Sequence, residues 1–430
     1  MVQSLTVAVL LGAGASADAE IPTTMKMTQE VIDRMTNARH VRILEFVRHT
    51  LAADLAQRQP PNRWERSEDV HIGVDVERLF ASVELLVDRN EQPWSPFVAT
   101  WHPGLESFSS ASSVNEHDMS FQLNNFESAL KSALSEASRA SGSSSRIDTR
   151  SIRKALAEVV AGGIQHARQN DVSKLLAQVR HEMLSSLFDV LNIDDPSKVG
   201  YLNPLIELAR SQGSLTIATL NYDRSIENVA ELAQLPCDTG IETWLERGNF
   251  EWPKEEGLRL LKLHGSIDWV VHGGSGARGE LPLQHFKKVE SDDEKLNYQQ
   301  PAVVFGENGK LRSEGPYLEL LLAWSRELER ASSLLVVGYS FRDPHVNELV
   351  ARWFNASPTH QIILVDPSDC QSADARSFAW YLAHVDDSIP IPDQRPRPAP
   401  RFRQFIGRTR DCLEQGIAAA STVLPVDAVD

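Results

Sequence analysis

Cysteine is scarce in this chain. Its 430 residues contain three, Cys237, Cys370 and Cys412, and no two of them form a CxxC pair. A zinc module with four cysteine ligands needs two such pairs, and a disulfide framework needs an even set, so the sequence excludes both. Three scattered thiols fit a reducing compartment, and we expect a cytoplasmic protein.

The sequence also lacks a basic excess and long apolar runs. Lys and Arg number 43 against 59 Asp and Glu, so the net charge is −16. Nucleic-acid binding needs a basic face, so we expect no direct nucleic-acid contact. No run of about 18 or more apolar residues occurs, so we expect no membrane span. The apolar stretch before Ala15–Ala17 resembles a signal peptide, but no Lys or Arg precedes it, so we expect it to belong to the fold.

Five short apolar runs indicate an α/β fold. Each is nearly continuous in apolar character, as in the central strands of a parallel sheet that is covered on both faces. The runs are Leu5–Leu11, Leu215–Leu220, Leu258–Leu263, Leu334–Val337 and Ile362–Val365. Polar residues or glycines follow most of them, and open α/β sheets bind ligands at the carboxyl ends of their strands. We therefore expect a Rossmann-like parallel sheet with a ligand site at that edge.

About 200 residues between the first two runs have a helical pattern, with apolar residues at spacings of three and four in Val74–Val87 and again between residues 152 and 187. A Pro-rich stretch, Pro390–Arg401, predicts an extended linker. At roughly 100–200 residues per domain, the length fits two or three domains, or one large domain with an insertion. We favour a nucleotide-binding domain of residues 1–25 and 200–390, a helical insertion of 26–199, and a linker and tail of 391–430.

A glycine-rich turn follows the first run. Gly12, Ala13, Gly14 and Ser16 stand where a strand would turn into a helix, and their spacing satisfies the loose dinucleotide-binding pattern GxGxx(G/A). Glycines let the backbone approach a pyrophosphate, and the amide groups of a following helix would face the anion. A glycine-rich turn without a ligand would have the same sequence, so this motif alone leaves both interpretations open.

Two further motifs follow the second and third runs. Asn221 offers both a donor and acceptors and Asp223 a carboxylate, which suits them to hold a ribose or position a water. A helix cap explains the same residues, and it would be the preferred interpretation if this motif stood alone. His264 precedes a glycine at a strand end, where an imidazole that titrates near neutrality could act as a general base. There are 13 histidines, so the position of His264 singles it out, not its residue type.

The last two runs end in a similar way. Gly338 and Ser340 could meet a phosphate or ribose, whereas Asp343 before Pro344 predicts the N-cap of a helix. Asp366 ends the last run, where a carboxylate can contact the hydroxyls of an adenosine ribose or simply close a turn. Each motif is ambiguous alone, yet all five fall at predicted strand ends of one sheet.

Taken together, the motifs resemble those of the sirtuin family. Residues 12–22 look like the family's GAGxS…GIP loop, residues 219–223 like its TQNxD motif, His264 with Gly265 like its catalytic histidine segment, and residues 338–340 like its GTS motif. Asp366 sits where the family has a polar adenosine contact. The resemblance covers residues 1–25 and about 200–370, and it implies a sirtuin-like Rossmann fold that binds NAD.

Two departures point away from lysine deacylation. Sirtuin deacylases carry a zinc module with two cysteine pairs, which three cysteines cannot build, and Thr23–Thr24 replace the family's Phe-Arg. The helical insertion, the segment around Asp75–Leu86 and the GYSFRDP form of residues 338–344 instead resemble the sirtuin-like effectors of bacterial anti-phage systems. That resemblance implies hydrolysis of NAD, as substrate, to nicotinamide and ADP-ribose without a metal. The role would be abortive infection through depletion of cellular NAD.

The resemblance also assigns roles to residues. Asn221 would order the nicotinamide ribose and the attacking water, Asp223 would orient that group, and His264 would act as base or ribose-hydroxyl partner. The residues that would bind the rest of the nucleotide are Gly12, Ala13, Gly14, Ser16, Gly338, Ser340 and Asp366. An NAD-dependent deacylase and a catalytically silent sensor of NAD or ADP-ribose stay open as alternatives. The resemblance further suggests a homo-oligomer and an activating partner in trans, such as a HerA-type ATPase.

Overall fold

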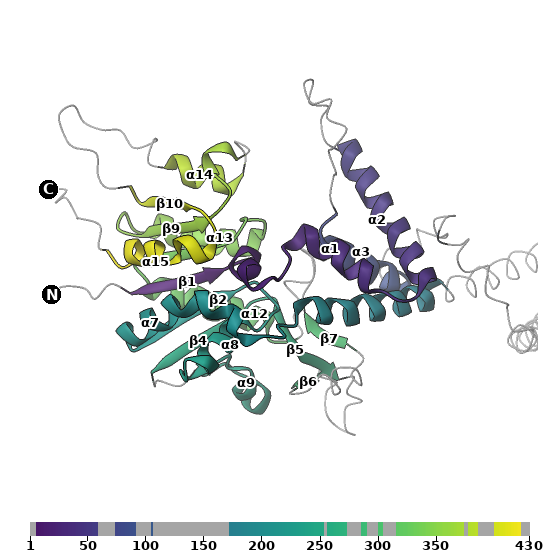
Figure 1. Cartoon of the computed structure of the whole chain (residues 1–430), viewed down its shortest axis with the longest axis horizontal. Coiled ribbons are helices and arrows are strands. Elements are labelled where there is room, and N and C mark those ends of the chain that lie inside the picture. The colour runs from purple at the N-terminus through teal and green to yellow at the C-terminus, as the bar shows by residue number, and fades with distance from the viewer. Residues whose placement is uncertain are drawn as a thin grey trace, which may run out of the picture. The chain divides into compact units, whose positions relative to one another are not determined.

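A computed structural model describes residues 6–58, 74–91, 105, 172–252, 256–272, 285–289, 300–303, 315–373, 377–385 and 400–422 (Figure 1). The chain divides into two compact units. The first comprises Met1–Thr36, Ala52–Ala81 and His181–Asp430, and the second comprises Asn37–Leu51 and Ser82–Arg180. The helical pattern predicted from residue 152 lies outside the described residues, apart from the stretch that starts at 172.

The first unit contains a seven-stranded, fully parallel sheet. Its strand order is β10-β9-β8-β1-β2-β4-β3. The strands are β1 (Val7–Leu11), β2 (Ser214–Thr219), β3 (Cys237–Asp238), β4 (Gly257–Lys262), β8 (Ser333–Val337), β9 (Gln361–Asp366) and β10 (Phe402–Ile406). All five predicted strands are present and adjacent, so the predicted Rossmann-like fold is confirmed.

The two faces of the sheet carry separate apolar cores, because successive side chains of a strand point to opposite faces. On one face, Leu10 of β1 and Val336 of β8 pack with α12 (Tyr317–Arg330), α13 (Pro344–Ala356) and α14 (Phe378–His384). On the other, Val9 and Val337 pack with α7 (Asn203–Gln212), α8 (Ser225–Leu232) and α15 (Thr409–Ala420). Each such buried aliphatic side chain contributes roughly 1.5–3 kcal/mol. Burial on both faces explains why the sequences of these strands are nearly continuous apolar runs.

Helices fill the described part of the connection between β1 and β2, as the fold prediction required. They include η1 (Ala13–Ala19), α1 (Thr24–Arg34), α2 (Ala38–Arg58), α3 (Val76–Val87), η2 (Asp88–Glu91), a helix over residues 172–191 and η4 (Pro196–Leu202). In α3 the apolar residues Val76, Leu79 and Phe80 are buried, as the helical pattern predicts. The Asp75 carboxylate caps this helix by accepting the Arg78 amide at 2.7 Å.

Two parts of the fold were not predicted. A three-stranded antiparallel sheet, of order β6-β5-β7, begins directly after His264 with β5 (Gly265–His272), β6 (His285–Lys288) and β7 (Gln300–Val303). In addition, β10 and α15 lie within the segment that the sequence analysis assigned to a linker and tail. β10 is an edge strand, and its half-buried side chains leave no continuous apolar run to detect.

The remaining elements are small. α9 (Ile241–Arg247) follows β3, and η5 (Cys370–Ser372) follows β9. Within the described ranges, no helix combines the length and the apolar character that a bilayer crossing requires.

Candidate functional site

The register of the sheet brings the five predicted motifs to one edge. Leu11 at the end of β1 is in register with Thr219 of β2 and with Val337 of β8. Thr219 is in register with Lys262 of β4, and Val337 with Val365 of β9. The chain leaves β1 for β2 on one side and returns to β8 on the other. The carboxyl end of β1 is therefore a topological switch point, where open α/β sheets bind ligands.

At the switch point, three glycines pack backbone against backbone. A Cβ atom on Gly338 would lie 2.3 Å from the Ala15 nitrogen, and one on Gly12 would lie 2.6 Å from the Gly338 oxygen. Gly338 also has φ of +61°, which disfavours any other residue. The amides of Gly12, Gly14 and Ala15 already donate to the carbonyls of Val337, Gly338 and Gly12. Ala13 is the first residue of η1, directly after Gly12.

Asn221 is fixed against the glycine-rich turn. Its Nδ2 atom donates to the Gly12 carbonyl at 2.9 Å and to Ser16 Oγ at 2.9 Å, and its amide nitrogen donates to Thr219 Oγ1 at 3.1 Å. A carbonyl oxygen can only accept, so Gly12 fixes the orientation of the side-chain amide. Both Nδ2 protons are used by these two bonds. Oδ1 of Asn221 is therefore the atom of this side chain that can accept a hydrogen bond from water or a ribose hydroxyl.

Asp223 acts within the turn that carries Asn221. The Asp223 carboxylate accepts the amide of Ser225, the first residue of α8, at 2.9 Å, and Ser225 Oγ donates to Ser16 Oγ at 3.2 Å. The fully buried Lys262 donates to the Asp223 carbonyl at 2.6 Å and to Glu227 Oε1 at 2.9 Å. Ser16, Asn221, Asp223 and Glu227 are among the residues that line a small cavity here. Asp223 is thus held by Lys262 through its backbone carbonyl, and its predicted orienting role stays a prediction.

His264 lies one strand further along the edge, after β4. Its side chain is buried, and Nε2 lies 2.8 Å from Oδ2 of Asp343, which is also buried. The Tyr222 ring lies beside it, with ring centroids 6.3 Å apart. Burial and the neighbouring Glu77 carboxylate raise the pKa of Tyr222 well above its usual value, which keeps the phenol neutral.

A strained loop carries Asp343 to His264. Phe341 has φ of +55°, a conformation that costs a non-glycine residue on the order of 1–3 kcal/mol. The Tyr339 hydroxyl accepts the Asp343 amide at 3.1 Å and donates to Asn347 Oδ1 at 2.9 Å. Asn347 Nδ2 in turn donates to the Phe341 carbonyl at 2.7 Å. These bonds close the loop, and Ser340 is left exposed at its surface.

Asp366 stands at the end of β9, two strands from β1. Its Oδ1 atom accepts the Ser368 amide at 2.8 Å, which matches the turn interpretation. The half-buried carboxyl has a pKa raised above its usual value, mainly because burial disfavours the charged form. Its position in line with Gly338 is compatible with the predicted adenosine contact.

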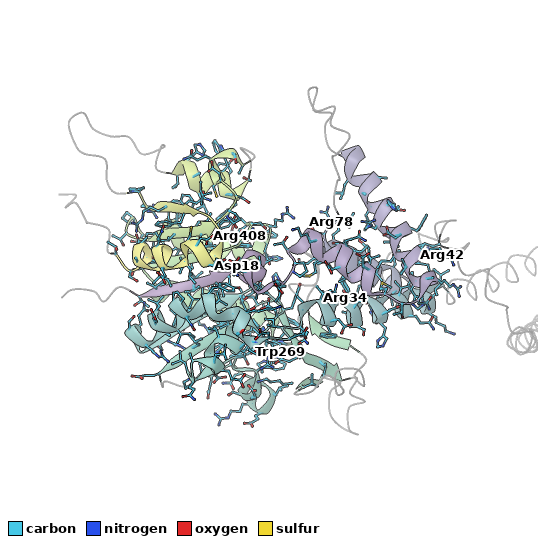
Figure 2. The ribbon with its side chains drawn as sticks, viewed as in Figure 1. Asp18, Arg34, Arg42, Arg78, Trp269 and Arg408 are labelled. Carbon is cyan, nitrogen blue, oxygen red and sulfur yellow. The ribbon has the colours of Figure 1, made fainter. Side chains whose placement is uncertain are left out.

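The start of α15 is attached to η1. Thr409 Oγ1 donates to the Gly14 carbonyl at 3.2 Å, and the Arg410 amide donates to Asp18 Oδ2 at 2.9 Å. Arg410 also forms an ion pair with Asp18 at 3.2 Å. Figure 2 labels Asp18 in η1 and Arg408, which precedes α15. Tyr201 of η4 also donates to the Ala15 carbonyl at 2.6 Å. The glycine-rich turn is thus held from two further elements.

One family model matches part of the chain. Residues 215–384 match the model of the SIR2-like domain. The chain is similar to a Sir2 homologue in complex with NAD, at 13% identity over 97% of this chain and 90% of that one, with a TM-score of 0.36. It is also similar to a triply substituted Sir2 homologue with 2′-O-acetyl-ADP-ribose, at 14% identity over 97% and 92%, with a TM-score of 0.36. No curated protein matches the chain.

The SIR2-like segment contains part of the candidate site. Asn221, Asp223, His264, Gly338, Ser340 and Asp366 fall within it, whereas the turn from Gly12 to Ser16 joins through the pairing of β1 with β2 and β8. The structure brings Gly12, Ser16 and Asn221 into direct contact and packs Gly14 against Gly338. His264 is instead bonded to Asp343, and Ser340 and Asp366 occupy separate places along the same edge.

Two residues contribute to the site in ways that their sequence motifs did not indicate. Asp343 was predicted only as the N-cap of a helix, and it also holds His264. Lys262 is the last residue of β4 and lies inside the predicted run Leu258–Leu263, where a charged residue gives no direct sign that it is buried. An alternating pattern could have suggested its burial, because Leu260 and Lys262 point to the same face.

Proposed function

We propose that this protein hydrolyses NAD to nicotinamide and ADP-ribose. The SIR2-like match of residues 215–384 and the motif resemblance support NAD as the substrate. One observation carries the proposal. Asn221 is locked by Gly12 and Ser16 beside the switch point, and the His264–Asp343 pair lies at a strand end of the same sheet edge.

The main contribution of the protein to this reaction would be to position the reactants. Cleavage of the nicotinamide–ribose bond passes through an oxocarbenium-like state, so the site must hold the reactive ribose and admit a water. Asn221 Oδ1 would accept a hydrogen bond from that water or from a ribose hydroxyl, and His264 would act as the base that takes the proton. Water oxygen bonds to the ribose carbon, the bonding pair leaves with nicotinamide, and one proton is released.

The anionic part of NAD would meet the amide of Ala13 at the start of η1. Gly12, Gly14 and Gly338 support this by letting the two strand-end loops meet, and Ser340 and Asp366 would contact the adenosine half. A net charge of −16 is compatible with anion binding, because backbone amides supply local positive potential.

The cysteine content favours hydrolysis over deacylation. The three cysteines of the sequence cannot form the two pairs that the zinc module of sirtuin deacylases needs. We further propose an abortive-infection role against phage, a homo-oligomer, and activation by an operon-encoded partner such as a HerA-type ATPase. Mass photometry of the isolated chain tests the oligomer, and a clean monomer would refute it.

The test of the activity is product analysis. Purified protein, alone and with the candidate activator, is incubated with NAD, with NADP in parallel, and the products are separated by chromatography. We expect nicotinamide and ADP-ribose, absent from the Asn221→Ala and His264→Ala variants. Nicotinamide release that depends on an added acyl-lysine peptide would favour the deacylase, and NAD binding without turnover under either condition would favour the sensor.

A further inference from the structure

Asp343 uses its two carboxylate oxygens for different purposes. Oδ1 accepts the amides of His345 at 2.9 Å and Val346 at 3.3 Å, which caps α13. Oδ2 lies 2.8 Å from Nε2 of His264. The loop that is closed by Tyr339 and Asn347 fixes the backbone of Asp343. The capping bonds leave the carboxylate little freedom to rotate, so Oδ2 faces His264.

This arrangement determines which nitrogen of His264 carries the proton. An ionised carboxylate can only accept hydrogen bonds, so Nε2 must be the donor. In a neutral imidazole, Nδ1 is then the acceptor. Nδ1 is buried and has no hydrogen-bond partner among the described residues. A buried acceptor without a partner marks a place where a water or a substrate hydroxyl is needed.

We propose that Asp343 is a positioning residue that sets the tautomer of His264 and so makes Nδ1 the base of the reaction. This inference rests on the proposed hydrolysis of NAD. Nδ1 takes the proton of the attacking water or of a ribose hydroxyl, the oxygen bonds to carbon, and nicotinamide leaves with the bonding pair. The imidazolium that results stays paired with Asp343 until its proton passes to solvent.

The helix cap makes a sharp test possible. In Asp343→Asn the side-chain oxygen must still accept the α13 amides, so the NH₂ group must face His264. Nε2 would then have to accept, and Nδ1 would carry the proton and could not act as a base. Asp343→Ser is the matched control, because serine also caps helices but is too short to reach Nε2. It leaves His264 free to adopt either tautomer.

We expect turnover to be fastest in the wild type, slower in Asp343→Ser and slowest in Asp343→Asn, although asparagine is the more conservative substitution. An asparagine that forces the wrong tautomer lowers kcat by about 10⁴-fold in the serine-protease triad, and we expect a loss of about 10³–10⁴-fold here. Asp343→Ser should lose about 10–100-fold, the scale of a misplaced group. The Kd for NAD should change by less than about threefold in both, because Asp343 does not touch the nucleotide in this account.

The tautomer itself is read by NMR with isotope-labelled histidine. Long-range proton–nitrogen correlations distinguish the two neutral forms, and the His264→Gln variant assigns the signal. We expect a protonated Nε2 in the wild type and a protonated Nδ1 in Asp343→Asn. A wild-type His264 protonated on Nδ1, or an Asp343→Asn variant at least as active as Asp343→Ser, would overturn the inference. The NMR result needs no turnover, so a failure of the proposed hydrolysis is recognised separately.

Discussion

Replacing Gly338 with alanine tests whether the glycines at the switch point are needed for packing. The new methyl group would lie 2.3 Å from the Ala15 nitrogen and 2.3 Å from the Gly14 carbonyl carbon, both of them backbone atoms that cannot rotate away. Forcing a side chain into a packed site costs about 1–3 kcal/mol. The left-handed conformation at φ of +61° adds about 1–2 kcal/mol. We expect Gly338→Ala to destabilise the protein by about 2–5 kcal/mol.

Gly213 provides a matched control. It also has positive φ, +76°, but an added Cβ would meet no atom within 4 Å. Gly213→Ala should therefore show only the conformational cost, and the difference between the two variants isolates the clash. Urea unfolding followed by tryptophan fluorescence measures both free energies, and NAD binding should weaken only in Gly338→Ala. Equal destabilisation of the two variants would refute the packing account.

Three further predictions concern neighbouring residues. Lys262→Met should cost about 3–5 kcal/mol because it leaves Glu227 buried without its partner; adding Glu227→Gln should recover much of this loss in a double-mutant cycle, and purely additive costs would contradict the pairing. Asn221→Asp cannot donate to the Gly12 carbonyl, so we expect NAD turnover to fall about 100-fold or more; near-normal turnover would contradict the role of that bond. Burial raises the pKa of Asp366 in the folded protein. The folded protein therefore binds this proton more tightly than the unfolded chain does. As a result, the free energy of unfolding falls as the pH rises from the unfolded pKa through the folded pKa. Asp366→Asn should therefore stabilise the protein above that pH range and change little below about pH 4, as thermal melts across pH would show.

The central sheet could be predicted because burial on both faces leaves a local signal. The runs that contain Val9, Leu260 and Ile363 are mostly apolar, and the polar residues of the candidate site follow directly after their ends. β10 gave no such signal, because an edge strand needs only partial burial. α15 was not predicted either. Its attachment to the sheet depends on a long-range contact, because Arg410 and Asp18 lie 392 positions apart in the chain.

The residues of the candidate site were easier to predict than their partners. Asn221 and His264 stand in recognisable motifs at strand ends. The bond from His264 to Asp343 spans 79 positions, and it depends on how a loop after β8 folds back across the sheet edge. The position of Asp343 before Pro344 is fully explained by its role as a helix cap, so no residue pattern indicated a second role. Long-range geometry of this kind becomes visible only in the folded chain.

The most direct test of NAD hydrolysis is the fate of the water oxygen. The reaction is run with NAD in water enriched in heavy oxygen, with and without the candidate activator, and ADP-ribose is analysed by mass spectrometry. We predict that each ADP-ribose formed by the wild type carries one heavy oxygen at the cleaved ribose carbon, and that the Asn221→Ala variant forms none. Unlabelled product, or an acylated ADP-ribose formed only with an acyl-lysine peptide, would contradict the account.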